Sequence, residues 1–440
     1  GRLKVVDAMG RPVAEYYDVA IAFERDAGSG AAALELAAKG RAGPWSAQAR
    51  VLAGREARKL DVAVKNLSSD EIALGAGFRE RPVDFDMPIS GHATLTLTQD
   101  DSIAAVAGDF AVGAGKIRFA DAGRDAFDID GVTGGFHWDP DTRAIVVEPS
   151  RLRAGDTAIA VQGMIAPRDA ASREWAYSFA STDNTLAPET RSDKAVKLGS
   201  IRTEGKYSVE SGVLTVDSLE FAGADVEMSA SGALVGGADG PAVKLALKAR
   251  RMNARDFLRF WPAMVAPEAR DWFVNSFRGG TLQGGDLKLD LDRHTIVSPK
   301  GTPIPDEVVS LWFDVSDATL DYLPGAPPLT GVAGRGHVGG RSAVFDATRG
   351  VIALGERKLS IPEAKFEAPD FGPDPVKARL TARIQGPLET ALDYLSRPAF
   401  KSFVKLPAAA QAARGQIDAR LTLDLELGKG AGPPSVRVEA

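Results

Sequence analysis

The sequence predicts an elongated all-β protein, an antiparallel sheet of repeated amphipathic strands with two short helical-hairpin insertions. Apolar and polar residues alternate with period two over many short runs, which is typical of strands with one face in water. The 46 glycines and 26 prolines mark the turns between these runs, which follow one another roughly every ten residues. Helix-like spacing is confined to two stretches. So many turns and so little helix favour an antiparallel meander.

Three runs show the alternation most clearly: Ala93–Thr98, Asp286–Asp292 and Arg420–Leu427. In each run leucine recurs at every second position, so we expect all the leucines of a run on one face of the strand. A shorter run at Leu214–Val216 follows the same rule. One face of the predicted sheet is therefore apolar along much of the chain.

The first helical insertion is predicted at residues 253–279. We expect Asn253 to cap a short helix that ends at Pro262, and Pro267 to open a second helix that the glycine pair 279–280 closes. This hairpin is rich in aromatic residues, namely Phe257, Trp261, Trp272, Phe273 and Phe277. Two interpretations remain open: a hydrophobic plug that packs against the sheet, or a surface that meets lipid or a partner.

The second helical insertion is predicted at residues 387–406. Pro387 is expected to open a helix in which Leu388, Leu392 and Leu395 share one face, because they are spaced i, i+4, i+7. Pro398 begins another short segment. This insertion is a less aromatic version of the first.

An internal repeat is indicated by two pairs of matching strands. Gly212–Val216 matches Gly350–Leu354, and Leu287–Leu291 matches Leu421–Leu425, with offsets of 138 and 134 residues. A near-constant offset across strand, hairpin and strand predicts two copies of one unit. The predicted division is an N-terminal β-array at 1–190, a first repeat unit at 191–298 with the hairpin 253–279, and a second repeat unit at 306–427 with the helical segment 387–406.

Length and composition exclude several classes of protein. A chain of 440 residues is too long for one compact core. The net charge of −6 and the pI near 5.5 argue against a nucleic-acid partner. With no cysteine, disulfides, thiolate metal sites and cysteine nucleophiles are excluded. No run approaches the roughly 18 apolar residues of a membrane-spanning helix. Because strand-like sequence starts almost at Gly1, we expect a piece of a longer protein, with any targeting segment outside it.

No motif predicts catalysis, a metal or a cofactor. The stretch Gly334–Gly339 fits a dinucleotide-binding glycine pattern, but strand-like sequence follows it where a helix is needed. Carboxylates spaced i, i+2 are expected to form the solvated face of a strand rather than an acid and base pair; they are Asp84/Asp86, Asp128/Asp130 and Asp290/Asp292. The four histidines are scattered without metal-ligand spacing: His92, His137, His294 and His337.

Both helical stretches resemble a known family. Asn253–Pro262 and Val265–Phe273, followed by the glycine pair 279–280, look like the YWP…APxARxW…GG segment of AsmA-like proteins in the YhdP branch, which are related to TamB. Gly386–Pro398 is similar to the GPLxxALxxLxxP segment of the same family. Phe260 stands where tyrosine is expected, a conservative difference. The resemblance covers about residues 190–427, and the residues before it agree in texture only.

The resemblance implies a bacterial bridge-like lipid-transfer protein. In such proteins a long sheet curls into a β-taco-like groove that carries phospholipid between the inner and outer membranes. It further implies a periplasmic location, an anchor in the inner membrane through a segment absent from this chain, and envelope proteins as further partners. The expected ligand is phospholipid or another acyl lipid. Each buried methylene is worth about 0.8 kcal/mol, so an acyl chain gains on the order of 10 kcal/mol spread along the groove.

Alternation and resemblance together predict the residues that line this groove. They are Leu95, Leu97, Leu214, Val216, Leu287, Leu289, Leu291, Leu421, Leu423 and Leu425. Two rival interpretations are kept. One is a structural or interaction scaffold of the cell envelope with a closed β-sandwich core and no transported ligand. The other is an enzyme on a β-scaffold, acting on glycans through one of the carboxylate pairs, for which the sequence offers no support.

Overall fold

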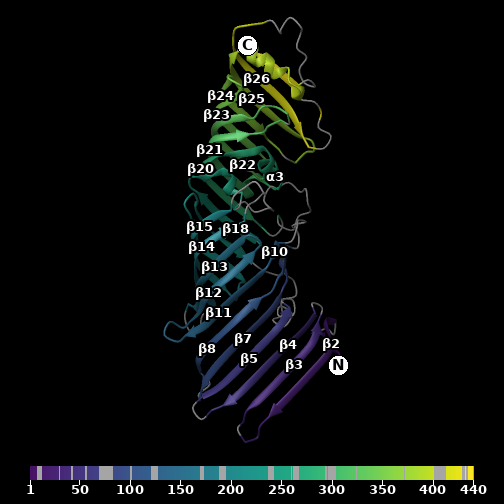
Figure 1. Cartoon of the computed structure of the whole chain (residues 1–440), viewed down its shortest axis with the longest axis vertical. Helices are drawn as coiled ribbons and strands as arrows, with labels where there is room; N and C mark the ends of the chain where they lie inside the picture. The colour runs from purple at the N-terminus through teal and green to yellow at the C-terminus, as the bar shows by residue number, and fades with distance from the viewer. Residues whose placement is uncertain are drawn as a thin grey trace. The chain divides into compact units, whose positions relative to one another are not determined.

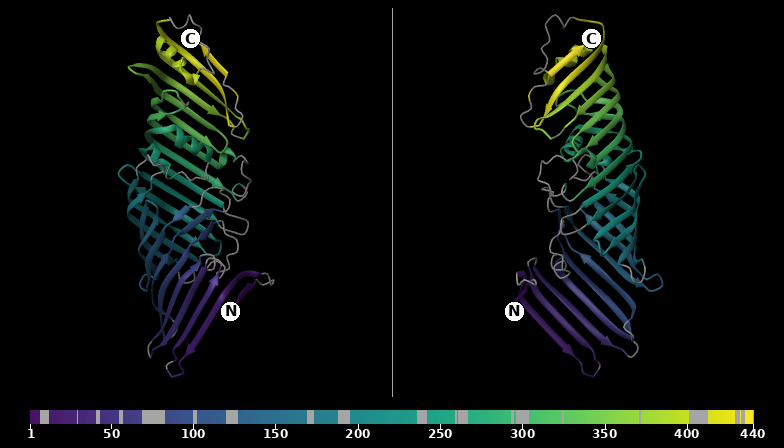
Figure 2. Two further views of the ribbon diagram at one scale, coloured as in Figure 1. Left: turned by 45° about the vertical axis from the view of Figure 1, so that its right-hand side comes forward. Right: turned by 180° about the vertical axis from the view of Figure 1, so that it is seen from behind.

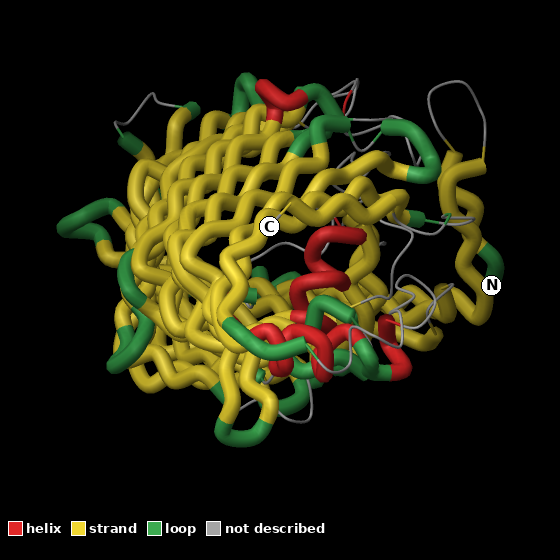
Figure 3. Tube along the Cα trace, turned by 90° about the horizontal axis from the view of Figure 1, so that it is seen from above, coloured by secondary structure: helices red, strands yellow, loops and turns green. Residues whose placement is uncertain are grey.

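A computed structural model confirms the all-β prediction. It contains a 24-stranded antiparallel sheet, a separate three-stranded sheet and few short helices (Figures 1 and 3). The structure describes residues 1–6, 12–28, 30–40, 43–54, 57–68, 83–99, 102–119, 127–168, 173–187, 195–235, 242–258, 260, 267–292, 295, 304–323, 325–370, 372–400, 413–428, 432 and 435–439.

The chain forms two compact units, one of residues 1–219 and 235–240 and the other of residues 220–234 and 241–440. We call them unit 1 and unit 2. Strands β16 (Val213–Ala222) and β17 (Glu227–Val235) each contain residues of both units. This division reflects compactness and not sequence repetition, so the repeat units at 191–298 and 306–427 stay a prediction.

Unit 1 is a meander in which each strand pairs with the next large strand along the chain (Figure 2). Its strands are β1 (Leu3–Val6), β2 (Pro12–Arg25), β3 (Ala32–Gly40), β4 (Gly43–Ala53), β5 (Ala57–Ser68), β7 (Pro88–Thr98), β8 (Ile103–Val112), β11 (Gly131–Asp139), β12 (Ala144–Ala154), β13 (Thr157–Pro167), β14 (Glu174–Leu186) and β15 (Val196–Ser208). The small sheet consists of β6 (Val83–Asp86), β9 (Gly115–Phe119) and β10 (Phe127–Ile129), and β10 lies against β12.

Unit 2 continues in the same manner, with β18 paired to β20 and each later strand paired to the next. Its strands are β18 (Ala242–Ala249), β19 (Met252–Asn253), β20 (Phe277–Leu291), β21 (Val309–Leu320), β22 (Leu329–Gly339), β23 (Ala343–Leu354), β24 (Arg357–Ala368), β25 (Val376–Pro387), β26 (Gln416–Leu427) and β27 (Ser435–Glu439). Its helical elements are α2 (Ala254–Phe257), α3 (Pro267–Ser276), α5 (Leu388–Leu395) and the short η1 (Asp306–Val308) and η2 (Pro398–Phe400).

The first helical insertion differs from its prediction at the C-terminal end. Asn253 caps α2 as expected, because its side-chain oxygen accepts a hydrogen bond of 2.9 Å from the Arg255 N–H. Phe277, however, is the first residue of β20 and pairs with Leu320, so the predicted hairpin end at 279 is wrong. The glycine pair that suggested a helix stop belongs to the strand, where a Cβ at Gly280 would lie 2.7 Å from the Ala318 backbone. Trp261 lies outside the described residues, and so does the end of the second insertion at 401–406.

Bulges interrupt the long strands at recurring positions. The register shifts between Tyr17 and Ala20 in β2, between Val64 and Leu67 in β5, and between Val315 and Ala318 in β21. Residues with positive φ lie at these shifts and in β14, namely Asp18, Asn66, Asp317 and Asp183. Aspartate and asparagine tolerate this left-handed backbone better than other residues with a Cβ. Because a bulge bends its strand and increases the local twist, each of these shifts bends the strand that carries it.

We predict that Asn66, whose φ is +56°, tolerates glycine but not valine. Asn66→Val should lower the free energy of unfolding by about 1–2 kcal/mol, because a β-branched residue is strained in the left-handed region. Asn66→Gly should change it by a few tenths of that amount. Urea denaturation of both variants checks this. Equal stabilities of the valine and glycine variants would contradict the left-handed backbone conformation at residue 66.

Ion pairs link neighbouring strands on one face of unit 2. Arg383 on β25 donates from Nε to the Asp418 carboxylate on β26 at 2.7 Å, and Gln385 Nε2 donates to the same carboxylate at 2.9 Å. These two donors lower the pKa of Asp418 to about 2, from an ordinary value of 3.8. A lowered pKa means that the stabilising effect is complete above the ordinary value and is lost as the pH falls toward 2.

Arg383→Gln is therefore expected to raise the pKa of Asp418 toward its ordinary value, because the hydrogen-bonding cation that favours the carboxylate is gone. A carboxyl NMR titration measures this directly. Lys244→Gln, which removes the partner of Asp290 elsewhere in unit 2, should leave the titration of Asp418 unchanged. An unaltered pKa in Arg383→Gln would show that the ion pair is not formed in solution.

Candidate functional site

One face of the unit 1 sheet is apolar and the other polar. Phe23, Leu34, Ala49, Val62 and Ala93 are directly opposed across β2, β3, β4, β5 and β7, so they form one row on one face. The opposite face carries Glu35, Gln48, Arg50, Asp61 and Thr94 in the neighbouring positions. We call the first of these the apolar face of unit 1. The pairing register thus separates an apolar face from a polar face, as the sequence predicts.

Large side chains on this apolar face are open to solvent near β2 and β3. Ile21 is 66% exposed, Phe23 65% and Leu34 42%. Ile21 is opposed to Leu36, and Phe23 to Leu34, so the exposed residues are contiguous. None of the protein that the structure describes buries these side chains. A contiguous exposed apolar surface of this kind is typical of a binding surface.

Farther along unit 1, aromatic rings lie over glycines of the neighbouring strand. A Cβ at Gly108 would lie 2.8 Å from the Phe136 ring, and one at Gly163 would lie 2.5 Å from the Phe179 ring. Both pairs are directly opposed across their strands. Because glycine presents no side chain, the ring can lie along the sheet instead of standing away from it. The rings thereby extend an apolar layer over β8, β11, β13 and β14.

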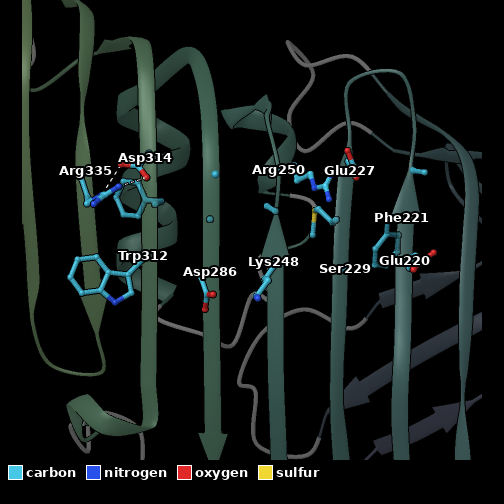
Figure 4. A pocket seen from close by; sticks show the side chains of 16 residues that line it. Glu220, Phe221, Glu227, Ser229, Lys248, Arg250, Asp286, Trp312, Asp314 and Arg335 are labelled. Carbon is cyan, nitrogen blue, oxygen red and sulfur yellow. Dashed lines mark hydrogen bonds and ion pairs between the residues drawn. The ribbon is translucent and has the colours of Figure 1, made fainter.

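The apolar face of unit 2 is covered near β20. Leu247, Leu287 and Leu311 are directly opposed across β18, β20 and β21, and each is at most 6% exposed. Helices α2 and α3 both contact β20, and they lie on the far side of the sheet from the polar side chains drawn in Figure 4. In α2 and the residue after it, Phe257 and Leu258 are buried. The aromatic residues Phe273 and Phe277 stack with their ring centroids 4.3 Å apart.

Helix α5 covers a second part of the same face. Its residues Ala391 and Tyr394 join a buried cluster with Leu359 and Ile361 of β24 and with Ala382 of β25. The Tyr394 hydroxyl forms a hydrogen bond with the hydroxyl of Tyr322, and burial raises the pKa of both phenols. Neither tyrosine therefore ionises near neutral pH. This hydrogen bond and the apolar cluster hold α5 on the strands.

The predicted groove residues fall into two groups. Leu287 and Leu289 are buried, at 4% and 5% exposure. Half-buried are Leu95, Leu97, Leu214, Val216, Leu291, Leu421, Leu423 and Leu425. Leu95 is opposed to Leu60 and Val106 on the apolar face of unit 1, while Leu423 is opposed to Leu380 and Val436 in unit 2. Leu95 and Leu423 thus have apolar neighbours on both sides, whereas Leu97 is opposed to Arg58 on one side, and the contact of these residues with lipid stays a prediction.

Sequence reasoning missed the most exposed members of the apolar face. Phe23 and Leu34 lie in runs that alternate less perfectly than the leucine runs. Only their cross-strand pairing assigns them to the apolar face, and this pairing cannot be read from the sequence of one strand. The same holds for Phe313 and Phe345, which lie 6.1 Å apart on either side of Gly336.

Neither a metal centre nor a membrane-spanning helix is found in the described part of the chain. No three His, Asp or Glu side chains there are placed to hold a metal ion. No helix there is long and apolar enough to cross a membrane. Of the paired carboxylates, Asp290 is exposed and forms an ion pair with Lys244 at 3.0 Å, which suits a solvated strand face.

The model of the family described as YhdP protein matches residues 161–440, which include all of unit 2 and the end of unit 1. The chain belongs to the YhdP family. This confirms the resemblance read from the two helical stretches. Neither a curated protein nor a solved structure matches the chain significantly. The YhdP family is a transport or structural family of the cell envelope rather than an enzymatic one.

The position of a ring over a glycine can be tested at Gly336, in the region that the YhdP family model matches. A Cβ at Gly336 would lie 2.1 Å from the Phe313 ring, whereas nothing lies within 4 Å of a Cβ at Gly279. Gly336→Ala should therefore lower the free energy of unfolding by about 1–3 kcal/mol through overpacking. Gly279→Ala should be neutral or slightly stabilising. Urea denaturation compares the two, and equal effects would show that the ring does not lie over the glycine.

Proposed function

We propose that this YhdP-family chain binds acyl lipid along the apolar face of its sheet and conducts phospholipid between the inner and outer bacterial membranes. The observation that carries the proposal is the contiguous exposed apolar surface at Ile21, Phe23 and Leu34. A sheet must cover its apolar face, and an acyl chain can do so where a second layer of protein does not. Phospholipid, or another acyl lipid, is the ligand that suits this surface.

Diffuse contact suits transport better than a single tight pocket does. The row Phe23, Leu34, Ala49, Val62 and Ala93 is apolar throughout, with no polar group that would fix a headgroup at one place. Each methylene that leaves water gains about 0.8 kcal/mol wherever it lies along the face. A lipid can therefore move from strand to strand without crossing a large barrier, and no catalytic group is needed.

The proposal includes a cellular setting. We infer a periplasmic location, with attachment to the inner membrane through a segment outside this chain and with envelope proteins as further partners. Family membership supports this setting. A scaffold of the envelope without a transported ligand is the second candidate. It is favoured by α2, α3 and α5, which cover parts of the unit 2 face with protein.

Two double variants that add the same charge test the proposal. Phe23→Asp with Leu34→Asp places two carboxylates on the apolar face, on directly opposed residues. Ala22→Asp with Leu52→Asp places two on the polar face, where both residues are also exposed. The first variant should carry several-fold less phospholipid than the unaltered protein, because a carboxylate is costly beside an acyl chain. The second should carry the normal amount.

Bound phospholipid is measured by extraction and mass spectrometry of the purified protein, and uptake by transfer of a fluorescent phospholipid from vesicles. Both double variants change exposed residues, so circular dichroism should show an unchanged fold. If the unaltered protein neither carries nor takes up phospholipid, the scaffold is the better account. Equal losses in both variants would refute the assignment of lipid to the apolar face. Leu289 is unsuitable for this test because it is buried, and a charge there would unfold the strand.

A further inference from the structure

The polar face of unit 2 carries a second surface that the lipid proposal does not use. Lys248, Asp286, Trp312 and His337 are directly opposed, one to the next, across β18, β20, β21 and β22. They alternate with the buried row Leu247, Leu287 and Leu311, so they point away from α2 and α3. Three strand spacings of about 4.8 Å make this row about 14 Å long.

Trp312 is the unusual member of the row. It is 50% exposed, although tryptophan is a large side chain that is mostly buried in folded proteins. Its indole stacks on the His337 ring, with centroids 4.1 Å apart and planes 26° from parallel. Nε2 of His337 lies 3.3 Å from the Ser310 hydroxyl, which fixes the imidazole. In Figure 4 the indole lies flat over the neighbouring strand and turns its other broad face outward. The protein thus supports the indole from beneath and leaves it open above.

A shallow cavity of about 810 Å³ adjoins the indole, a volume within the usual range for small-molecule sites. Figure 4 shows Lys248, Asp286 and Trp312 on the strands that form its floor. At its borders, Arg335 donates to both carboxylate oxygens of Asp314, at 2.8 and 3.0 Å. Arg250 and Glu227 form another ion pair at 2.8 Å. Hydrogen-bonding groups of both signs therefore surround one flat apolar surface.

We infer that this surface binds carbohydrate, with one sugar ring stacked on Trp312 and its hydroxyl groups bonded to Asp286 and Lys248. A pyranose whose substituents are equatorial has an apolar face of C–H groups, which is complementary to the electron-rich face of an indole. Its rim carries hydroxyls that both donate and accept, as a carboxylate beside an ammonium group requires. The row is long enough for a short β-linked oligosaccharide.

Other ligands fit the surface less well. An acyl chain would leave Asp286 and Lys248 without water beside it, which is costly. Around the indole, acidic and basic side chains are paired, Arg335 with Asp314 and Arg250 with Glu227. The surface therefore offers neither an organic cation nor a phosphate group a site of a single opposite charge. A neutral sugar meets none of these penalties. The inference does not depend on lipid binding, because within unit 2 this row lies on the face opposite to Leu247, Leu287 and Leu311.

Isothermal titration calorimetry with the tetramer of β-1,4-linked N-acetylglucosamine tests the inference on the full chain. The unaltered protein should bind the tetramer at millimolar or lower concentration and should bind the α-1,4-linked glucose tetramer more weakly. Trp312→Ala should weaken binding about tenfold or more, and Asp286→Asn about threefold. Trp312→Phe should restore part of the affinity, because a smaller ring still offers a flat face. Tyr207→Ala, which removes an exposed aromatic residue in unit 1, should have no effect.

Two results would overturn the inference. One is the absence of binding to either tetramer by the unaltered protein at millimolar concentration. The other is unchanged binding in Trp312→Ala, with a normal circular dichroism spectrum for that variant. The phospholipid content of Trp312→Ala should match that of the unaltered protein, since the substitution lies on the polar face. Loss of sugar binding with normal lipid content therefore separates this inference from the proposed lipid function.

Discussion

The rest of the structure depends on what covers the apolar face of the sheet. Period-two alternation gives each strand one apolar and one polar side, and hydrogen bonding between strands joins the apolar sides into a continuous surface. Water does not cover such a surface without cost, because each exposed apolar square ångström costs roughly 25 cal/mol. In unit 2 the helices cover part of the apolar face, and Leu287 and Ile361 are buried there. In unit 1 the described residues leave Phe23 open.

Bulges bend the strands, and glycines let large apolar rings lie along the sheet. The positive-φ residues Asp18, Asn66, Asp183 and Asp317 introduce bulges that bend their strands. Gly108, Gly163 and Gly336 accept the rings of Phe136, Phe179 and Phe313, so large apolar groups lie along the sheet. If side chains stood at these glycine positions, the rings would project away from the sheet. They would then need another layer of protein to bury them. A layer of flat rings and small side chains presents instead a smooth surface that a flexible chain can follow.

Much of this could be predicted from the sequence, because the leucine runs alternate so regularly. Leu287 and Leu289 face the apolar side and Lys288 faces water, as the pattern requires. Asn253 caps α2, as expected of an asparagine just before a helical run, because its side-chain oxygen accepts a hydrogen bond from a backbone N–H of the first turn. The residues that the YhdP family model matches, 161–440, include both helical stretches. Local signals therefore sufficed where one residue and its neighbours decide the structure.

The rest depended on pairing between strands, which no single run contains. Phe277 looks like the end of a helix because glycines follow it, yet its partner Leu320 makes it the start of a strand. Trp312 lies in three consecutive apolar residues, Leu311 to Phe313, so alternation alone does not say which of them faces water. Only the register with Asp286 and His337 assigns the indole to the polar side. The two proposals therefore rest on different physical grounds: lipid on the apolar area that a ligand removes from water, and sugar on the polar groups that the strand register places side by side.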